Sequence, residues 1–224
     1  DMKLEEGTIA ELKAKFGDIY KVECDLGMVV HRHPSQAEID AYLLGTVRGT
    51  TQESANNLVF SCRVWPEAGV VAKMFDEAPA VVTKFAEEIS EVAGADTDDI
   101  LGLQPRDLDS ASDEERTGIE ARAGKTFDAI RNEHPRGCLR LVTLPFVGPS
   151  IFRRPTRSTY AAFLDASKTD EVMNAARTMC AECAITDEKA LPEVFSKKPA
   201  VSFFLAFALG ALAGAHLEVR SGKL

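Results

Sequence analysis

The sequence predicts a mostly helical α+β protein made of two tandem copies of one small domain, each with a short helix, a β-hairpin and a helical bundle. The main observation is a stretch that occurs twice. PAVVTKFAEEISEVAGA at 79–95 returns 120 positions later as PAVSFFLAFALGALAGA at 199–215. Pro in the first turn and Gly near the end are typical of a helix with marked ends. We therefore expect a first repeat domain over 1–95, an acidic linker over 96–124 and a second repeat domain over 125–224.

The first copy contains signals for helices, strands and turns. Ser35 and Glu38 have the spacing of a capping box, which starts a helix after the strands. Alternating apolar residues on both sides of Asp25-Leu26-Gly27 predict a β-hairpin. Pro66 disfavours a helical conformation at Trp65, so the preceding helix should end there. The expected elements are a helix over 8–15, a hairpin over 18–31, a helix that starts after Ser35, and helices over 51–64, 70–77 and 79–95.

The second copy follows the same order. Arg153-Arg154-Pro155-Thr156 stands 121 positions after Arg32-His33-Pro34-Ser35, and 139–144 is expected to be the first strand of its hairpin. From Phe195 onward the offset is 120, so one residue is lost between the two regions. A single deletion in a loop, over about 85 residues, is the pattern expected of a duplicated domain.

Residues 96–124 differ in composition from both copies. They contain nine acidic and three basic residues and few large apolar ones. Gly102, Pro105 and the frequent Asp and Ser are typical of a solvated linker. We expect one helix within it, near 113–122.

The overall charge and the cysteines limit the possible classes of function. The chain has 224 residues, a net charge of -9 and a pI near 5.0. Nucleic-acid binding depends largely on Lys and Arg that neutralise phosphates, so we expect no nucleic-acid partner. The five cysteines are an odd number and no basic and apolar signal region precedes them, which predicts free thiols and a cytoplasmic location.

The second copy of the repeated helix raises the question of a membrane span. Ala200 to Ala215 is an uncharged run of 16 residues. A spanning helix needs roughly 20 apolar residues, and the same helix in the first copy is amphipathic. We therefore expect no membrane partner, and a helix that is either buried in the fold or covered by another protein.

Two groups of residues have spacings found in metal or redox sites. Cys180 and Cys183 form a Cys-x-x-Cys pair, but they lie within a predicted helix and no second pair of ligands follows. His31 and His33 would share one face of a strand, but Phe152 takes the place of His31 in the second copy. We interpret both groups as structural and expect no catalytic residue, no metal and no cofactor.

The most specific functional signal is the charge that the second repeated helix lacks. The first copy carries Lys84, Glu87 and Glu88 on its outer face, whereas the second copy is apolar all round. A domain of about 90 residues usually leaves one helix face outside, and burial of that face favours contact with another chain. Burial within the fold is the alternative. The residues expected to bind a protein partner are Phe203, Phe204, Phe207, Leu209 and Leu212.

Several short motifs of the first copy return in the second. Those of the first copy are LKAKFGDIYKVE, Arg32-His33-Pro34-Ser35 with Tyr42, and CRVWPEAGVVAKMFDEAPAVV through Gly94. Those of the second are Arg153-Arg154-Pro155-Thr156 with Phe163, and FSKKPAV through Gly214. Their order resembles a family of tail assembly chaperones of tailed bacteriophages. The resemblance implies a non-enzymatic protein of the host cell cytoplasm that binds hydrophobic segments of a tape measure protein.

The chain also departs from the pattern of that family. The tandem arrangement is unusual, and Thr186-Asp187 stands where the first copy has Trp65-Pro66. One alternative function is a structural component of a phage particle or similar assembly, with the two copies as quasi-equivalent subunits. A second alternative is a metal-binding or redox protein that uses Cys180 and Cys183. A homo-oligomer is compatible with each of these functions.

Overall fold

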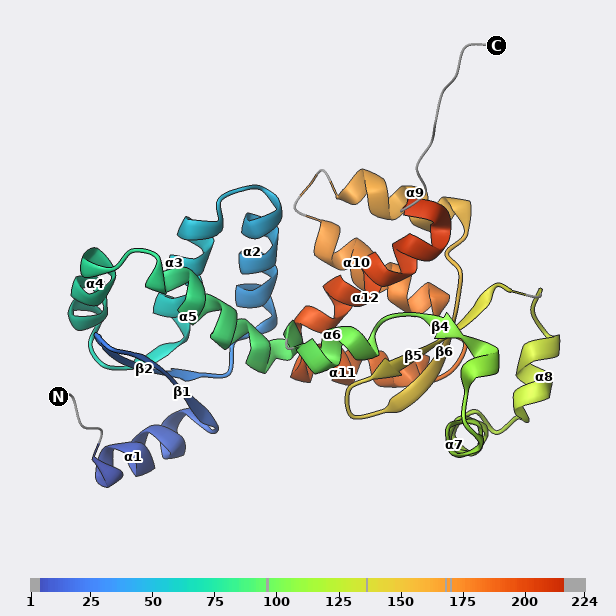
Figure 1. Ribbon diagram of the computed structural model, residues 1–224, viewed down its shortest axis with the longest axis horizontal. Coiled ribbons are helices and arrows are strands. Elements are labelled where there is room, and N and C mark those ends of the chain that lie inside the picture. Colours follow the sequence, from blue (N-terminus) through green and yellow to red (C-terminus); the bar gives the residue numbers. More distant parts are fainter. Residues whose placement is uncertain (1–4, 96, 136, 168, 170, 216–224) are drawn as a thin grey trace, which may run out of the picture. The chain divides into compact units, whose positions relative to one another are not determined.

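The computed structural model describes residues 5–215, except 96, 136, 168 and 170 (Figure 1). Most of these residues are helical, and small antiparallel sheets of three strands accompany the helices, which confirms the predicted α+β class. The described chain forms two compact units. The first comprises residues up to 97 together with 198–200, and the second comprises the rest. Within the described residues, no helix is both long and apolar enough to cross a bilayer.

The first unit packs a three-stranded sheet against helices. β2 (Gly27–Arg32) lies between β1 (Ile19–Cys24) and β3 (Arg63–Trp65), and both pairs are antiparallel. The hairpin turns where the sequence predicts, but β3 was not predicted, because it follows directly on a helix without a turn signal. The helical elements are α1 (Glu6–Phe16), α2 (Gln36–Val47), α3 (Thr51–Cys62), α4 (Ala68–Glu77), α5 (Val81–Ser90) and the π-helical turn η1 (Glu91–Ala95).

The core of the first unit lies between its sheet and the helices that follow. Val29 of β2, Ile39 of α2, Val59 of α3 and Ile89 of α5 are each fully buried. α3 packs against both α2 and α5. Gly94 has a φ of 93°, so the last turn after α5 ends in the left-handed conformation that the repeated Ala-Gly-Ala predicts.

The second unit repeats this architecture. The order of elements from α1 to η1 returns from α8 to η4, although a single bridge between Phe152 and Ala184 takes the place of β3. The hairpin strands are β5 (Leu139–Leu144) and β6 (Gly148–Arg153). The helical elements are α8 (Phe127–Asn132), α9 (Arg157–Ala166), α10 (Val172–Cys183), η3 (Glu188–Ala190), α11 (Leu191–Lys197), α12 (Ala200–Gly210) and η4 (Ala211–Ala215).

The segment 98–124 differs from the solvated linker expected over 96–124, because it belongs to the second unit. β4 (Arg106–Asp107) pairs with β5 and supplies the third strand of the second sheet. Leu108 and Ile119 are buried in one cluster with residues of α8 and β5. The segment also contains α6 (Thr97–Gly102), η2 (Leu108–Ser110) and α7 (Asp113–Ala123), of which α7 matches the predicted helix.

Ion pairs attach this acidic segment to the second repeat. Within the segment, Arg106 of β4 pairs with Glu115 in the first turn of α7, and Arg122 of α7 pairs with Asp187 beyond the segment at 2.9 Å. Asp109 pairs with Arg131 of α8 at 2.9 Å. Asp107, Asp109 and Glu115 of the segment therefore pair with arginines, which composition alone does not reveal.

Candidate protein-binding site

α5 of the first unit shows what the repeated helix needs in order to pack. Val82, Phe85 and Ile89 are buried at the spacing of one helix face. Lys84 and Glu87 lie on the opposite, exposed face. The helix is amphipathic, and its apolar face packs against α3.

α12 keeps the buried stripe but not the charged face. Leu205 and Leu209, the counterparts of Phe85 and Ile89, are fully buried. Phe207 takes the place of the exposed Glu87, and 51% of its surface is exposed. Full burial of such a side chain contributes about 1.5–3 kcal/mol. At Phe207 the fold itself provides only part of that contribution.

The structure divides the five residues predicted to contact a partner into three groups. Phe207 is exposed. Phe204 and Leu212 are half-buried. Phe203 and Leu209 are buried, with exposed fractions of 9% and 0%. Only the first two groups present surface that another molecule could cover.

Aromatic rings of α9 and α12 pack around Phe207. The rings of Phe163 and Phe207 meet edge to face at 6.0 Å between centroids, and those of Phe203 and Phe207 lie 4.7 Å apart. The rings of Phe203 and Phe204 also meet, with 5.6 Å between centroids. We call Phe204 and Phe207, together with the buried rings of Phe163 and Phe203, the Phe207 patch.

Cys180 and Cys183 have a packing role in this structure. Both are fully buried, and the thiol of Cys180 donates to the carbonyl of Ser202 on α12 at 3.6 Å. Burial raises the pKa of Cys183 to about 11 and raises the pKa of Cys180 as well. Thiols that stay protonated at neutral pH are poor nucleophiles and poor metal ligands. Within the described residues, no group of three or more His, Cys, Asp or Glu side chains is placed to hold a metal ion.

His31 and His33 are likewise part of the packing of the first unit. His31 is 1% exposed and stacks on Tyr20 with 5.5 Å between ring centroids. Its Nδ1 lies 3.0 Å from the carbonyl oxygen of Arg32. Burial lowers the pKa of His31, so the neutral form is favoured. These contacts agree with the structural interpretation.

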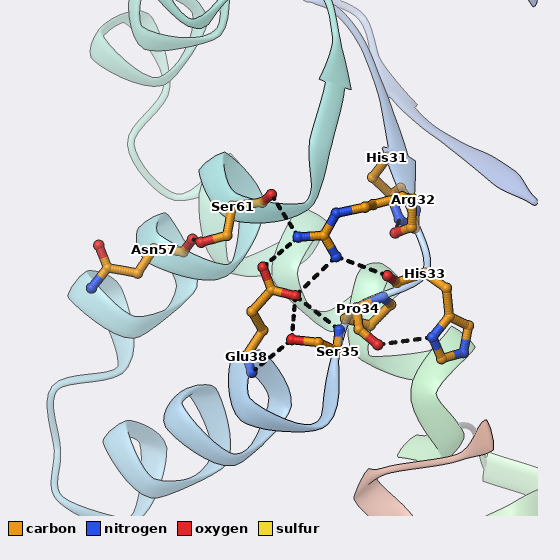
Figure 2. A network of polar contacts seen from close by, with 8 residues as sticks. All are labelled: His31, Arg32, His33, Pro34, Ser35, Glu38, Asn57 and Ser61. Carbon is orange, nitrogen blue, oxygen red and sulfur yellow. Dashed lines mark hydrogen bonds and ion pairs between the residues drawn. The ribbon is translucent and has the colours of Figure 1, made fainter. Parts of the chain in front are cut away.

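Figure 2 shows a polar network around the Arg-x-Pro-Ser motif of the first copy. Arg32 donates two hydrogen bonds to the carboxylate of Glu38, at 2.7 and 2.9 Å, and a third to the carbonyl oxygen of Ser61 at 3.2 Å. Ser35 and Glu38 form the predicted capping box of α2. Burial opposes ionisation of Glu38, but the bonds from Arg32 and Ser35 outweigh it and lower its pKa to about 2. The motif thus joins β2 to the start of α2 and the end of α3.

The second copy has the same junction, but its carboxylate lies on the second of the two helices instead of the first. Arg153 donates to the carbonyl oxygen of Glu182 at 3.0 Å, as Arg32 does to Ser61 in the first copy. Thr159 stands in the place of Glu38, and its hydroxyl donates to the carboxylate of Glu182 at 2.6 Å. The carboxylate has moved from the first helix to the second, and the hydroxyl has moved the other way. In both copies the Arg of this motif thus joins the hairpin to the helix two elements later.

The substitution of Trp65-Pro66 by Thr186-Asp187 also has a structural reason. The hydroxyl of Thr186 accepts a hydrogen bond from the backbone N–H of Ile151 on β6 at 2.9 Å. Asp187 accepts from Arg122 of α7 and from Ser150, both at 2.9 Å. These residues fasten the segment 98–124 to the second repeat. Sequence reasoning missed this site because its residues lie far apart along the chain.

The two repeats provide the comparison for each other, since no family model, no curated protein and no solved structure matches this chain.

Proposed function

We propose that this chain is a non-enzymatic binding protein that holds an apolar helical segment of another protein on the Phe207 patch. The observation that carries the proposal is Phe207, a half-exposed aromatic residue where the same helix of the first copy has Glu87. The first copy shows that the fold does not require an apolar residue at this position. A binding function supplies a reason for it.

The patch is suited to weak and reversible binding. Covering the exposed part of Phe207 contributes on the order of 1–2 kcal/mol. The half-buried Phe204 adds less. Association also costs several kcal/mol of translational and rotational freedom. A patch of this size therefore favours temporary retention of a partner, as a chaperone requires, over a permanent complex.

The resemblance to tail assembly chaperones suggests the partner. We propose that it is a hydrophobic segment of a tape-measure-type protein, which the chain keeps from aggregating in the host cytoplasm until the tail forms around it. Such a chaperone is absent from the finished particle. Detection of this chain in purified particles would therefore contradict the proposal.

The direct test measures binding of a helical probe to the full chain. The probe is a fluorescein-labelled peptide of about 20 residues with Leu along one face and Gln elsewhere. We expect Phe207→Glu to weaken binding at least tenfold, equivalent to about 1.4 kcal/mol, with an unchanged circular dichroism spectrum. Leu101→Glu, at another exposed apolar residue of the second unit, is the matched control and should leave binding unchanged. Equal binding by wild type and Phe207→Glu would overturn the proposal.

A further inference from the structure

A groove of about 450 Å³ runs between α9 and α10 in the second unit. Phe163 and Met179, which are 5% and 1% exposed, lie at its base, and Ala162, Ala166 and Ala175 line it with accessible methyl groups. Small side chains allow another helix to approach closely, because the distance between helix axes depends on the side chains at the contact. The groove therefore has the lining that a helix could occupy.

The first copy explains why the groove is open in the second. At the position of Ala166 the first copy has Gly45, which faces Ser54 of α3. A Cβ added to Gly45 would lie 2.6 Å from the Cβ of Ser54 and 1.6 Å from its Oγ, so α2 and α3 meet without room for a methyl group. The second copy has Ala at both positions. The methyl groups of Ala166 and Ala175 prevent α9 and α10 from approaching as closely as α2 and α3 do at Gly45 and Ser54.

The buried ring of Phe163 connects the groove with the Phe207 patch. Phe163 lines the groove and also meets the ring of Phe207 at 6.0 Å. α10 has 12 residues, so its length is roughly 18 Å, or a little more than three helical turns. A partner helix of that length would span the groove.

The charge of the groove points to the chemistry of its occupant. Glu171 and Glu182 lie at its rim, and among the described residues no Lys or Arg lines it. Glu182 is fixed by the hydroxyl of Thr159, which donates to its carboxylate at 2.6 Å. The chain as a whole carries a net charge of -9. A basic side chain beside an apolar one is the complement of this rim.

We propose that the groove between α9 and α10 binds the partner segment as an amphipathic helix, with an apolar side chain against Ala166 and Ala175 and a Lys or Arg beside Glu171 or Glu182. This inference rests on the proposed function and assigns the partner its chemistry. Helix-in-groove binding reads such anchors at spacings of three, four and seven residues. Specificity for a basic amphipathic helix follows from the rim, whereas the Phe207 patch alone selects only for apolar surface.

The test compares two labelled peptides of about 20 residues that share a Leu face and differ only in having Lys or Glu beside it. The full chain should bind the Lys peptide at least tenfold more tightly than the Glu peptide, a difference that high salt should reduce. Glu171→Lys should weaken binding of the Lys peptide and strengthen binding of the Glu peptide. Glu114→Gln, which removes an exposed acid from α7, is the control and should change neither affinity.

A second pair of variants blocks the groove without changing charge. Ala175→Leu fills it at a half-buried position, and Ala162→Leu does so at an exposed position where the fold tolerates the larger residue. Each variant should weaken binding of the Lys peptide at least fivefold. If Phe207→Glu abolishes binding while both groove variants and Glu171→Lys leave it unchanged, the groove is not the site and the proposed function stands. If the wild-type chain binds no Leu-faced peptide, the proposed function itself fails.

Discussion

α5 and α12 occupy corresponding positions in the two copies of the domain, and they differ most on the face that is charged and exposed in α5. The inward positions stay apolar and buried, as in Phe85 and Leu205 or Ile89 and Leu209. The outward position of Glu87 becomes Phe207, and that of Lys84 becomes Phe204. Two of the changed positions are buried in α12, since Phe203 and Ala208 stand where the first copy has Thr83 and Glu88. The exposed Phe207 is the change that packing explains least. The first copy therefore serves as an internal reference for the second.

The largest expected effect separates the two faces of α12. Leu209→Glu places a charge at a fully buried position and should cost more than about 4 kcal/mol, enough to unfold the second unit. Phe207→Glu, at an exposed position that still has ring contacts with Phe163 and Phe203, should cost about 1–2 kcal/mol. Urea denaturation followed by circular dichroism measures both. Comparable losses would mean that Phe207 belongs to the core and would remove the distinction between the faces.

The next effect concerns the contact of α2 with α3. Gly45→Ala should destabilise the first unit by about 2–3 kcal/mol, because the new methyl group collides with Ser54. The reverse change in the second copy, Ala166→Gly, should cost about 1 kcal/mol or less, since only helix propensity is lost. Thermal unfolding of the two variants checks the difference. A neutral Gly45→Ala would show that the helices of the two copies pack alike.

A smaller effect, dependent on pH, distinguishes the two Arg networks. The pKa of Glu38 is about 2 in the folded chain, below its ordinary value of 4.5, so its stabilisation is present above about pH 4.5 and is lost as the pH falls toward 2. Because the carboxylate is partly exposed, we expect about 1–2 kcal/mol instead of the full value for such a shift.

Glu38→Gln provides the measurement for this network. The variant should be less stable than the wild type at pH 7 and nearly equal to it at pH 2, as followed by urea denaturation at several pH values. Thr159→Ala, at the same position of the second copy, removes no charge and should produce a loss without this pH dependence. A constant difference between wild type and Glu38→Gln across the range would contradict the assigned role of Arg32.

The smallest expected effect tests the attachment of the segment 98–124. Arg122→Ala should destabilise the second unit by about 1 kcal/mol, because Asp187 is 6% exposed and loses its cationic partner. Lys125→Ala breaks the pair with Glu133, in which both side chains are about half exposed, and should cost clearly less than Arg122→Ala. Equal losses in chemical denaturation would mean that Asp187 does not anchor the segment.

Local signals predicted much of the fold. The capping box of Ser35 and Glu38, the hairpin turn before Gly27 and the cap at Gly94 each depend on neighbouring residues, and all three are present. The repeat also predicted which positions of α12 correspond to those of α5. These features need only a few adjacent residues to specify them, which is why a single sequence reveals them.

Tertiary pairing was less predictable. β3 has three residues directly after α3 and exists only because it pairs with β2. β4 has two residues in a segment whose acidic composition indicated a linker. At the candidate site, the sequence indicated the apolar face of α12 but could not separate the exposed Phe207 from the buried Leu209. The groove between α9 and α10 depends on how two helices meet, which Ala166 and Ala175 reveal only beside Gly45 and Ser54.

Because β4 pairs with β5, the structural unit around the second repeat begins earlier in the chain than the sequence repeat does. The repeat begins at about residue 126, but the second sheet is complete only when the chain from residue 98 onward is included. A fragment cut at the repeat boundary would leave the outer edge of β5 unpaired and would expose Leu141 and Ile151. Such an edge favours self-association. Expression of the second domain alone should therefore start at residue 98, and any circular permutation or fusion should spare this stretch.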